Sequence, residues 1–352
     1  MFRQIPFEEA EMKVVKEIPG RMGAMPSKLR NTPVSSRENQ AALFYEKKPF
    51  WMPMVAETKG IGPSLYSVNL GRGLMADSDD IFGLHWTYVA SAGGSTIHPG
   101  NPLLDDANNW KNVIKIPDVE NWDWDAAVEE VGPVDMAYPA QMTFINGFWF
   151  ERLISFMDFM PAAMALIDEE QTDALKELFQ ATTDMACKLV DVFCEKWPSI
   201  TEFNVHDDWG AQKAPFFSQD VAYELFVPYM KQLTDHIHAK GRLATLHSCG
   251  HTEDRVQAYI DGGFDQWTPQ PMNDIRKLYE EYGDKMVFGV WPDPFDYENA
   301  TEEEVRAFAR KFVDDYSQPG KPAVLSHTIT REVNEVFLDE VYRYSRKLYA
   351  ER

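Results

Sequence analysis

Two side chains that can bind a metal ion lie two residues apart in the segment His247-Ser248-Cys249-Gly250. Side chains at positions i and i+2 of a β-strand point to the same side, so His247 and Cys249 can present an imidazole and a thiolate to one ion, a combination that suits zinc. Gly250 then lets the chain turn away. Taken alone, the pair also fits the commoner arrangement of a buried cysteine beside a hydrogen-bonded histidine.

Two adjacent carboxylates, Asp207 and Asp208, follow another apolar run. Pleating sends neighbouring side chains to opposite faces unless the strand has already ended, so one of the two is the candidate acid or base, or orients the metal. The alternative is a carboxylate that caps a helix or pairs with an arginine.

Further aromatic side chains lie at or near the ends of predicted strands, where they could form an apolar wall around a flat ring, and polar side chains nearby could line the mouth of the site. Ordinary packing of a protein core is the alternative for each of them. The candidates for substrate binding are His85, Trp86, Phe148, His206, Trp209, Gln270 and Trp291.

Short apolar runs alternate with long segments of helical period, which is typical of parallel strands joined by crossover helices. Eight strands are predicted, at residues 50–56, 81–89, 136–145, 203–207, 243–249, 264–268, 286–291 and 323–327. We therefore expect an α/β fold, a (β/α)8 TIM barrel, whose chemistry lies at the C-terminal ends of the strands. Residues 1–48 are expected to form a helical or irregular N-terminal arm or lid, and residues 49–352 the single barrel domain.

Helix boundaries are also marked in the sequence. An apolar stripe predicts a helix over residues 172–197, and a second helix after Ser218 should be kinked or divided by Pro228. Thr301 and Glu304 form a capping box at the start of one helix. Gly283 would end the preceding helix, which contains Ile275, Leu278 and Tyr279. Cys187 and Cys194 fall near the first stripe and are interpreted as small packed hydrophobes.

The composition excludes several classes of protein. The chain has 352 residues and a formal net charge of −22, which should repel nucleic-acid phosphates and anionic lipids. No stretch approaches the roughly 20 apolar residues of a membrane span, and no signal peptide is found. Three cysteines, an odd number, favour a reducing compartment over a disulfide framework. A cytoplasmic protein that binds neither nucleic acid nor membrane is expected.

An ordered series of motifs resembles the uroporphyrinogen decarboxylase superfamily, and within it the branch of corrinoid-dependent methyltransferases. The likeness runs from about Ser35 onward through most of the chain. It is carried by Ser35-Ser36-Arg37-Glu38-Asn39, Asp80-Ile81-Phe82-Gly83, Phe150-Glu151-Arg152, Asp207-Asp208-Trp209-Gly210-Ala211-Gln212, Pro228-Tyr229, His247-Ser248-Cys249-Gly250, Gln270-Pro271 and Ser326-His327.

The resemblance implies zinc at the barrel mouth and a methyl group that passes between a small substrate and the cobalt of a corrinoid. Members of this branch commonly complete the zinc site with a cysteine on the last strand, but this chain has none after Cys249. His327 is the natural replacement, with Asp207 or Asp208 as oxygen donors instead. No motif for cobalamin ligation occurs, so the corrinoid, or cobalamin, is expected on a partner protein, and a homodimer is possible.

The aromatic side chains favour a methoxylated aromatic as methyl donor, and thus O-demethylation, over methanol or a methylamine. Transfer from methylcobalamin to a thiol would use the same site in the opposite direction. A cofactor-free decarboxylase is a further alternative, although the Arg-Gln-Ala-Gly-Arg-Tyr motif of that branch is absent. A non-enzymatic relative that binds a small molecule or corrinoid would leave the ligand-type residues unexplained.

Overall fold

The computed structural model describes residues 4–18, 27–70, 76–90, 94–326 and 333–352. Seven parallel strands follow one another in one sheet, in the order β12-β11-β10-β9-β8-β7-β3, with helices between them. The fold is therefore the predicted α/β TIM barrel. The strands are β3 (Lys59–Ile61), β7 (Ala140–Phe144), β8 (Glu202–His206), β9 (Leu243–His247), β10 (Gln266–Trp267), β11 (Val287–Val290) and β12 (Ala323–Leu325).

The chain divides into two compact units. Unit 1 comprises Met1–Lys59, Asp135–Pro139 and Gln266–Arg352, and unit 2 comprises Gly60–Val134 and Ala140–Asp265. The division at residue 48 into an arm and a barrel stays a prediction.

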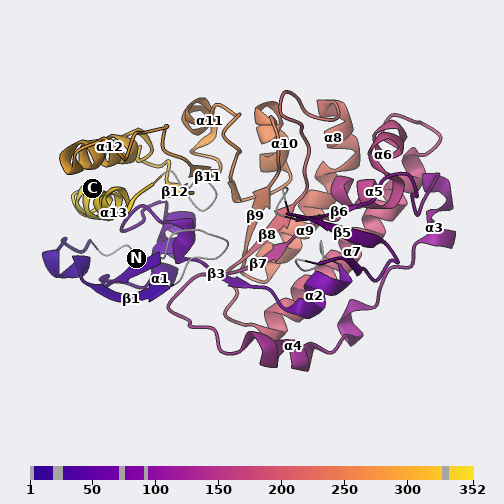
Figure 1. The fold of residues 1–352 in the computed structure, drawn as a ribbon, viewed down its shortest axis with the longest axis horizontal. Helices are drawn as coiled ribbons and strands as arrows, with labels where there is room; N and C mark the ends of the chain where they lie inside the picture. Colours follow the sequence, from indigo (N-terminus) through magenta and orange to yellow (C-terminus); the bar gives the residue numbers. More distant parts are fainter. Residues whose placement is uncertain (1–3, 19–26, 71–75, 91–93, 327–332) are drawn as a thin grey trace. The chain divides into compact units, whose positions relative to one another are not determined.

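In unit 2 the strands β7, β8 and β9 run side by side, and helices α7 and α9 pack together (Figure 1). A separate antiparallel sheet has the order β4-β5-β6. The further elements of unit 2 are α2 (Ser64–Asn69), β4 (Ser78–Asp79), β5 (His85–Val89), β6 (Gly94–Ile97), α3 (Trp110–Val113), α4 (Trp124–Val131), α5 (Phe150–Met157), α6 (Phe159–Ala165), α7 (Thr172–Lys196), α8 (Gln219–Leu225), α9 (Val227–Ala239) and α10 (Val256–Asp261), with short helices at Ala107–Asn109, Val119–Asn121 and Glu253–Arg255.

In unit 1 the long helices α12 and α13 pack against each other (Figure 1). Strands β1 and β2 form an antiparallel pair. The further elements of unit 1 are β1 (Val14–Ile18), β2 (Ser27–Arg30), α1 (Ser36–Ala41), α11 (Ile275–Tyr282), α12 (Glu302–Asp315) and α13 (Glu335–Ala350), with short helices η1 (Glu9–Met12), η2 (Ala42–Glu46) and η3 (Val55–Glu57).

The predicted helix boundaries are confirmed. Helix α7 ends at Lys196, and Pro228 stands in the first turn of α9, directly after the break that separates α8 from α9. The hydroxyl of Thr301 accepts a hydrogen bond from the Glu304 amide, and the Glu304 side chain returns to Thr301, so the capping box of α12 is complete. These boundaries depend on local hydrogen bonds and proline sterics, which the sequence specifies directly.

The first two predicted strands are wrong. Residues 50–56 form only one parallel bridge, Met54 to Leu325, because Pro53 has no amide proton and the Met52 amide donates to the Ser345 hydroxyl. In residues 81–89 the strand begins only at His85, since the Asp80 carboxylate accepts the amides of Phe82 and Leu84 and makes a turn there. That strand, β5, belongs to the antiparallel sheet.

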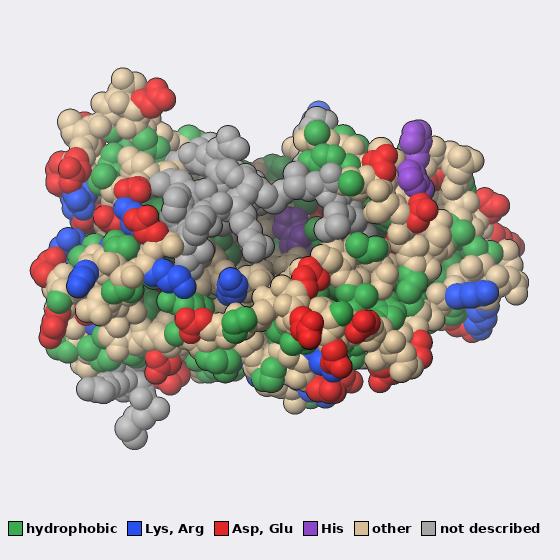
Figure 2. Space-filling view, turned by 60° about the horizontal axis from the view of Figure 1, so that its bottom comes forward, with side chains coloured by type: hydrophobic (Ala, Val, Ile, Leu, Met, Phe, Trp, Pro, Cys, Tyr) green, Lys and Arg blue, Asp and Glu red, His purple; other side chains and the backbone are tan. Residues whose placement is uncertain are grey.

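Acidic side chains are scattered over the face drawn in Figure 2, and Lys and Arg lie singly or in small groups among them. No helix among the described residues combines the length and the apolar character that a membrane crossing needs.

Candidate functional site

The C-terminal ends of β8 and β9 bring the predicted metal-binding residues together. The two strands are parallel and pair in register up to His206 opposite His247. Both strands end at the same edge of the sheet. One further hydrogen bond, from the Asp207 amide to the His247 carbonyl at 3.1 Å, continues the pairing there. Asp208 and Cys249 therefore follow neighbouring strand ends, where TIM barrels carry their chemistry.

Asp208, His247 and Cys249 form a cluster in which one ligand atom of each lies within 4.8 Å of the others. His247 Nε2 is 3.2 Å from Cys249 Sγ and 3.9 Å from Asp208 Oδ1. All three side chains are half-buried. The Cys249 amide donates to Asp208 Oδ1 at 2.7 Å, so the carboxylate also fixes the turn that carries the thiol.

The chemistry of this donor set fits zinc. A tetrahedral zinc ion with ligands at about 2.0–2.3 Å requires donor atoms roughly 3.3–3.8 Å apart, close to the two separations found here. Nitrogen, sulfur and oxygen donors are all ordinary zinc ligands, and three of them leave a position for substrate. His327, the predicted further ligand, lies outside the described residues.

Two glycines allow the turn after Cys249 to lie against the turn after Asp208. Gly250 has φ +92°, and a Cβ on it would lie 2.2 Å from the backbone carbon of Gly210. Beside this contact, the Trp209 amide donates to the Ser248 hydroxyl at 3.1 Å. The cluster thus depends on close backbone approach of two loops, which glycine alone permits.

Asp207 has different surroundings from its neighbour. Its side chain is fully buried and accepts hydrogen bonds from the amides of Phe150 and Glu151, at 3.2 and 2.9 Å, and from Trp209 Nε1 at 2.8 Å. Burial raises the pKa of Asp207 to about 7, against these hydrogen bonds, which lower it. The carboxylate caps the first turn of α5 from a neighbouring strand.

His206 lies next to the cluster. Its ring centroid is 4.4 Å from that of His247, with the planes tilted by 31°. Both rings are half-buried. His206 therefore restricts the rotation of the imidazole of His247, from which one donor of the cluster comes.

A cavity of about 640 Å³ adjoins the cluster and is bordered by Asp208 and Gly210. Its volume lies within the range of small-molecule sites. Apolar side chains make up much of its lining, and they are Trp86, Val89, Ile97, Pro99, Ile154, Phe159 and Phe216. Asn146, Ser95, Ser155, Glu151 and Asp158 supply polar groups.

A buried ion pair holds Trp86 in this wall. Asp80 Oδ2 accepts Trp86 Nε1 at 3.0 Å and lies 3.6 Å from Arg152 Nη1, with both charged side chains almost fully buried. Arg152 also donates to the Leu70 carbonyl at 2.5 Å. The structure thereby joins two of the motifs recognised in the sequence, at residues 80–83 and 150–152.

The other substrate-binding candidates lie in varied environments. Phe148 and Trp209 are fully buried in aromatic clusters, and His85 is exposed and contacts Asp79. Gln270 and Trp291 belong to unit 1, where Trp291 Nε1 donates to the Pro269 carbonyl. Of the seven, Trp86 lines the cavity. Their assignment to substrate binding stays a prediction.

Asn146 and Ser95 line the cavity but were not among the residues expected from the sequence. One signal for Asn146 was present, because an Asn-Gly pair directly after a strand favours positive φ. Asn146 and Gly147 indeed have φ of 70° and 49°. Ser95 lies in an irregular region of the sequence that carries no comparable signal.

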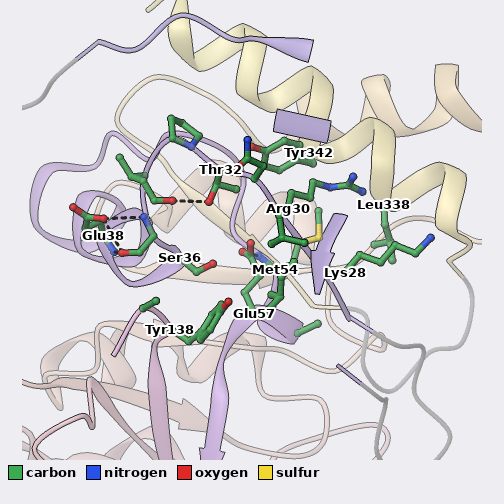
Figure 3. A pocket seen from close by; sticks show the side chains of 18 of the residues that line it. Lys28, Arg30, Thr32, Ser36, Glu38, Met54, Glu57, Tyr138, Leu338 and Tyr342 are labelled. Carbon is green, nitrogen blue, oxygen red and sulfur yellow. Dashed lines mark hydrogen bonds between the residues drawn. The ribbon is translucent and has the colours of Figure 1, made fainter. Parts of the chain in front are cut away.

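A second cavity, of about 360 Å³, lies within unit 1 (Figure 3). Its cationic side chains are held in ion pairs, Lys28 with Glu335 and Arg30 with Asp339. Glu57 also lines it, and burial raises the pKa of Glu57 to about 7. Among the described residues of this lining no three metal-binding side chains come together.

No protein-family model and no curated protein matches the sequence. Among solved structures, a methyltransferase from Methanosarcina mazei superposes with a TM-score of 0.59 at 14% identity, over 90% of this chain and 99% of that chain. A xylose isomerase-like TIM barrel protein from Mycobacterium smegmatis matches with a TM-score of 0.32 at 11% identity, over 67% of this chain and 78% of that one. The first similarity shows that the fold is shared with a methyltransferase.

Proposed function

We propose that the chain is a zinc-dependent methyltransferase of the uroporphyrinogen decarboxylase superfamily. It would move a methyl group from a small methoxylated aromatic, by O-demethylation, to a cobalt corrinoid carried by a partner protein. The observation that carries the proposal is the cluster of Asp208, His247 and Cys249 at the C-terminal ends of two barrel strands. The motif series in the sequence and the fold shared with a methyltransferase support it.

In this proposal Asp208, His247 and Cys249 hold the metal, and His327 is a further candidate ligand. A zinc ion bound there would supply a Lewis acid beside the cavity, with a coordination position open to an ether oxygen. The protein's own groups would orient that ligand set, with His206 against the ring of His247 and Asp207 fixing the strand end.

Cleavage of an ether C–O bond leaves an oxygen that must take up a proton. Glu151, a residue of the cavity lining that is 6% exposed, is the candidate to supply or take up that proton. Asp158, the other carboxylate of the lining outside the metal cluster, accepts the Gly100 amide at 2.8 Å. Apolar side chains around these groups would exclude water from the reacting oxygen.

Metal content tests the site first. We expect close to one equivalent of zinc in protein purified without added metal, and loss of most of it in Cys249→Ser. Cys187→Ser is the matched control, since Cys187 is a half-buried thiol on α7 outside the cluster. A wild-type protein that is active without metal would refute the zinc mechanism, whereas unchanged zinc in His327→Ala would remove that residue from the ligand set.

The activity is tested with a reduced corrinoid protein and a methoxyarene, by following the cobalt absorption spectrum. Methylation of cobalt that requires this protein and is lost in Cys249→Ser supports the proposal. No spectral change with a panel of methyl ethers, in the presence of bound zinc, would contradict it.

A further inference from the structure

We infer that the exposed apolar side chains of α6 form the surface on which the corrinoid-carrying partner protein docks. This α6 patch consists of Phe159, Met160, Met164 and Ile167, and it adjoins the cavity beside Asp208. The inference rests on the proposed function for the identity of the partner. Its evidence comes from the outer surface of unit 2 and not from the metal cluster.

Helix α6 is apolar on its exposed face as well as on its packed face. Its seven residues, Phe-Met-Pro-Ala-Ala-Met-Ala, include no polar side chain. Ala162 and Ala165 are buried, whereas Met160 and Met164 are 64% and 55% exposed. A helix at the surface of a protein normally turns polar side chains to water. The outer face of α6 is therefore of the kind that another molecule covers.

Exposed apolar side chains are concentrated at this helix. Of the eleven large apolar side chains that are exposed among the described residues, four belong to the α6 patch. Met160, Met164 and Ile167 follow one another at intervals of four and three residues, so they lie along one side of the helix and of the turn after it. Single exposed apolar side chains are ordinary, but a group of them marks an interaction surface.

The backbone and the packing of α6 fix the patch in position. Asp158, the residue between α5 and α6, has φ 64° and ψ 162°, a combination that residues other than glycine rarely adopt. Its carboxylate accepts the Gly100 amide at 2.8 Å, which ties the joint between the two helices to the loop after β6. The rings of Phe159 and Phe216 pack edge to face with centroids 4.9 Å apart. A surface that is already in place loses little conformational entropy when a partner binds.

The α6 patch is continuous with the cavity. Asp158, Phe159 and Phe216 belong to the cavity lining, and Phe159 is at the same time 39% exposed. Phe159 therefore lies where the lining meets the outer surface. In the proposed function a methyl group leaves this cavity for a cobalt that another protein carries, so that protein must cover the cavity at the surface. A protein docked there would contact the α6 patch.

The charges near α6 indicate the chemistry of the partner's face. From residue 153 to residue 175 the chain contains no Lys or Arg but five carboxylates, those of Asp158, Asp168, Glu169, Glu170 and Asp173. A face with apolar side chains at its centre and Lys or Arg around them is complementary to this surface. In a symmetric contact between two copies of this chain the carboxylates would face each other, and an anionic membrane would be repelled as well.

Binding of a panel of purified, cobalamin-loaded corrinoid proteins to the full chain tests the inference by calorimetry. The double variant Met160→Gln/Met164→Gln removes apolar surface but keeps side-chain length and helix propensity. We expect its dissociation constant for a corrinoid protein that binds the wild type to rise at least about tenfold. Met136→Gln is the matched control and should bind like the wild type, because Met136 is also 55% exposed but lies outside the patch, in unit 1.

The carboxylates provide a second measurement. Glu169 and Glu170 are exposed, so Glu169→Gln/Glu170→Gln should weaken binding at low ionic strength and reduce the dependence of the affinity on salt. The unfolding midpoints of all these variants should stay at that of the wild type, since each replaced side chain is exposed.

Several results would overturn the inference. One is unchanged affinity in Met160→Gln/Met164→Gln, and another is an equal loss in Met136→Gln. Failure of every corrinoid protein of the panel to bind the wild type would also contradict it. A wild-type dimer in sedimentation velocity that dissociates in the double variant would assign the patch to a second copy of the chain. Binding to phosphatidylcholine vesicles that is lost in the double variant would assign it to a membrane.

The two proposals can fail separately. Free cob(I)alamin needs no docked protein, so the double variant should methylate it as fast as the wild type does and methylate the corrinoid protein more slowly. Equal rates with the corrinoid protein contradict the inference and leave the methyltransferase in place. Binding of a corrinoid protein that depends on Met160 and Met164, without methylation of either cobalt acceptor, contradicts the methyltransferase and leaves the docking surface in place.

Discussion

Two neighbouring carboxylates at the end of β8 have different surroundings, and the difference lies in their partners. Asp207 is enclosed and receives three donors, two of them from the backbone of α5. Asp208 is half-buried, faces His247 and Cys249, and borders the cavity. From these contacts we expect Asp207 to act on stability and Asp208 on metal binding.

Asparagine at each position separates these roles. Asp207→Asn turns an amide group toward donors and should lower the free energy of unfolding by about 2–3 kcal/mol, with zinc content near that of the wild type. Asp208→Asn should lower zinc content while the free energy of unfolding changes by less than about 1 kcal/mol. Urea unfolding and metal analysis of both variants check this, and equal loss of zinc in the two would contradict it.

At the residue scale, the sequence predicted which residues lie at the metal-binding cluster better than it predicted the role of each residue. His247 and Cys249 were expected together on the assumption that one strand carries both. The strand β9 ends at His247, and the turn held by Asp208 brings the thiol to the imidazole. Asp207 and Asp208 could not be told apart, because their roles depend on α5 and on β9, which are distant in the chain. The Asn-Gly pair indicated the backbone conformation of Asn146, but that Asn146 and Ser95 line the cavity could not be predicted, because it depends on the folded structure.

At the scale of elements, the loops after β8 and β9 meet through Gly210 and Gly250. In Gly250→Ala the new methyl group would overlap backbone atoms at a φ of +92°, so we expect a loss of more than about 3 kcal/mol in the free energy of unfolding and a loss of zinc.

Gly241→Ala is the control for that substitution. Gly241 has a comparable φ of +67° but nothing within 4 Å of a Cβ, so the expected loss is only about 1 kcal/mol, with zinc retained. Equal unfolding midpoints for the two variants would show that backbone strain, and not the contact of the two loops, determines the effect.

A buried ion pair joins η1 to α13 in unit 1. Arg346 Nε lies 3.0 Å from Glu11 Oε2, both side chains are nearly fully buried, and the Tyr342 hydroxyl donates to the same carboxylate at 3.0 Å. Arg346→Met leaves Glu11 buried without its cation and should destabilise the protein by about 3–5 kcal/mol.

Arg343→Met tests the specificity of that effect. Arg343 pairs with Glu9 on the surface of the same two elements, and exposed pairs contribute about 1 kcal/mol or less. Thermal unfolding of both variants gives the comparison. A loss for Arg346→Met as small as that for Arg343→Met would contradict the assigned role of the buried pair.

The elements that the sequence predicted well are those with local determinants. Helix α7 ends just before Pro198, and α9 begins with Pro228 in its first turn. Helix α12 begins directly after its capping residue, Thr301. The errors in residues 50–56 and 81–89 come from side chains, those of Ser345 and Asp80, that accept backbone amides which a strand would use. An apolar run shows that a segment is buried, but it does not show which acceptor its amides find.

For the whole molecule, Glu57 makes stability depend on pH. Its side chain, labelled in Figure 3, lines the second cavity. It accepts hydrogen bonds from the Trp51 indole and the Met54 amide, and burial raises its pKa from about 4.5 to about 7. The unfolded chain releases this proton at lower pH than the folded protein does. Between pH 4.5 and 7 the folded state therefore holds more protons, and the free energy of unfolding falls as pH rises through this window.

We expect Glu57 to account for about 2–3 kcal/mol of that fall, and Glu57→Gln to remove this part of it. Carboxylates whose pKa is lowered, such as Glu304 in its capping box, act in the opposite direction and only at more acidic pH. Urea unfolding between pH 4.5 and 8 measures the slope. The same slope in Glu57→Gln as in the wild type would contradict the assignment.

The pairing of Glu11 with Arg346 spans 335 residues of sequence, and unit 1 is composed of three separate segments. A ribosome that adds about 5–20 residues per second needs on the order of 20 to 70 s to synthesise the partner of a residue that far away. During that time Glu11 lacks the Arg346 guanidinium with which it is buried in the folded protein. The buried ion pair of unit 1 can thus form only after α13 has been synthesised, on the order of a minute after Glu11 itself.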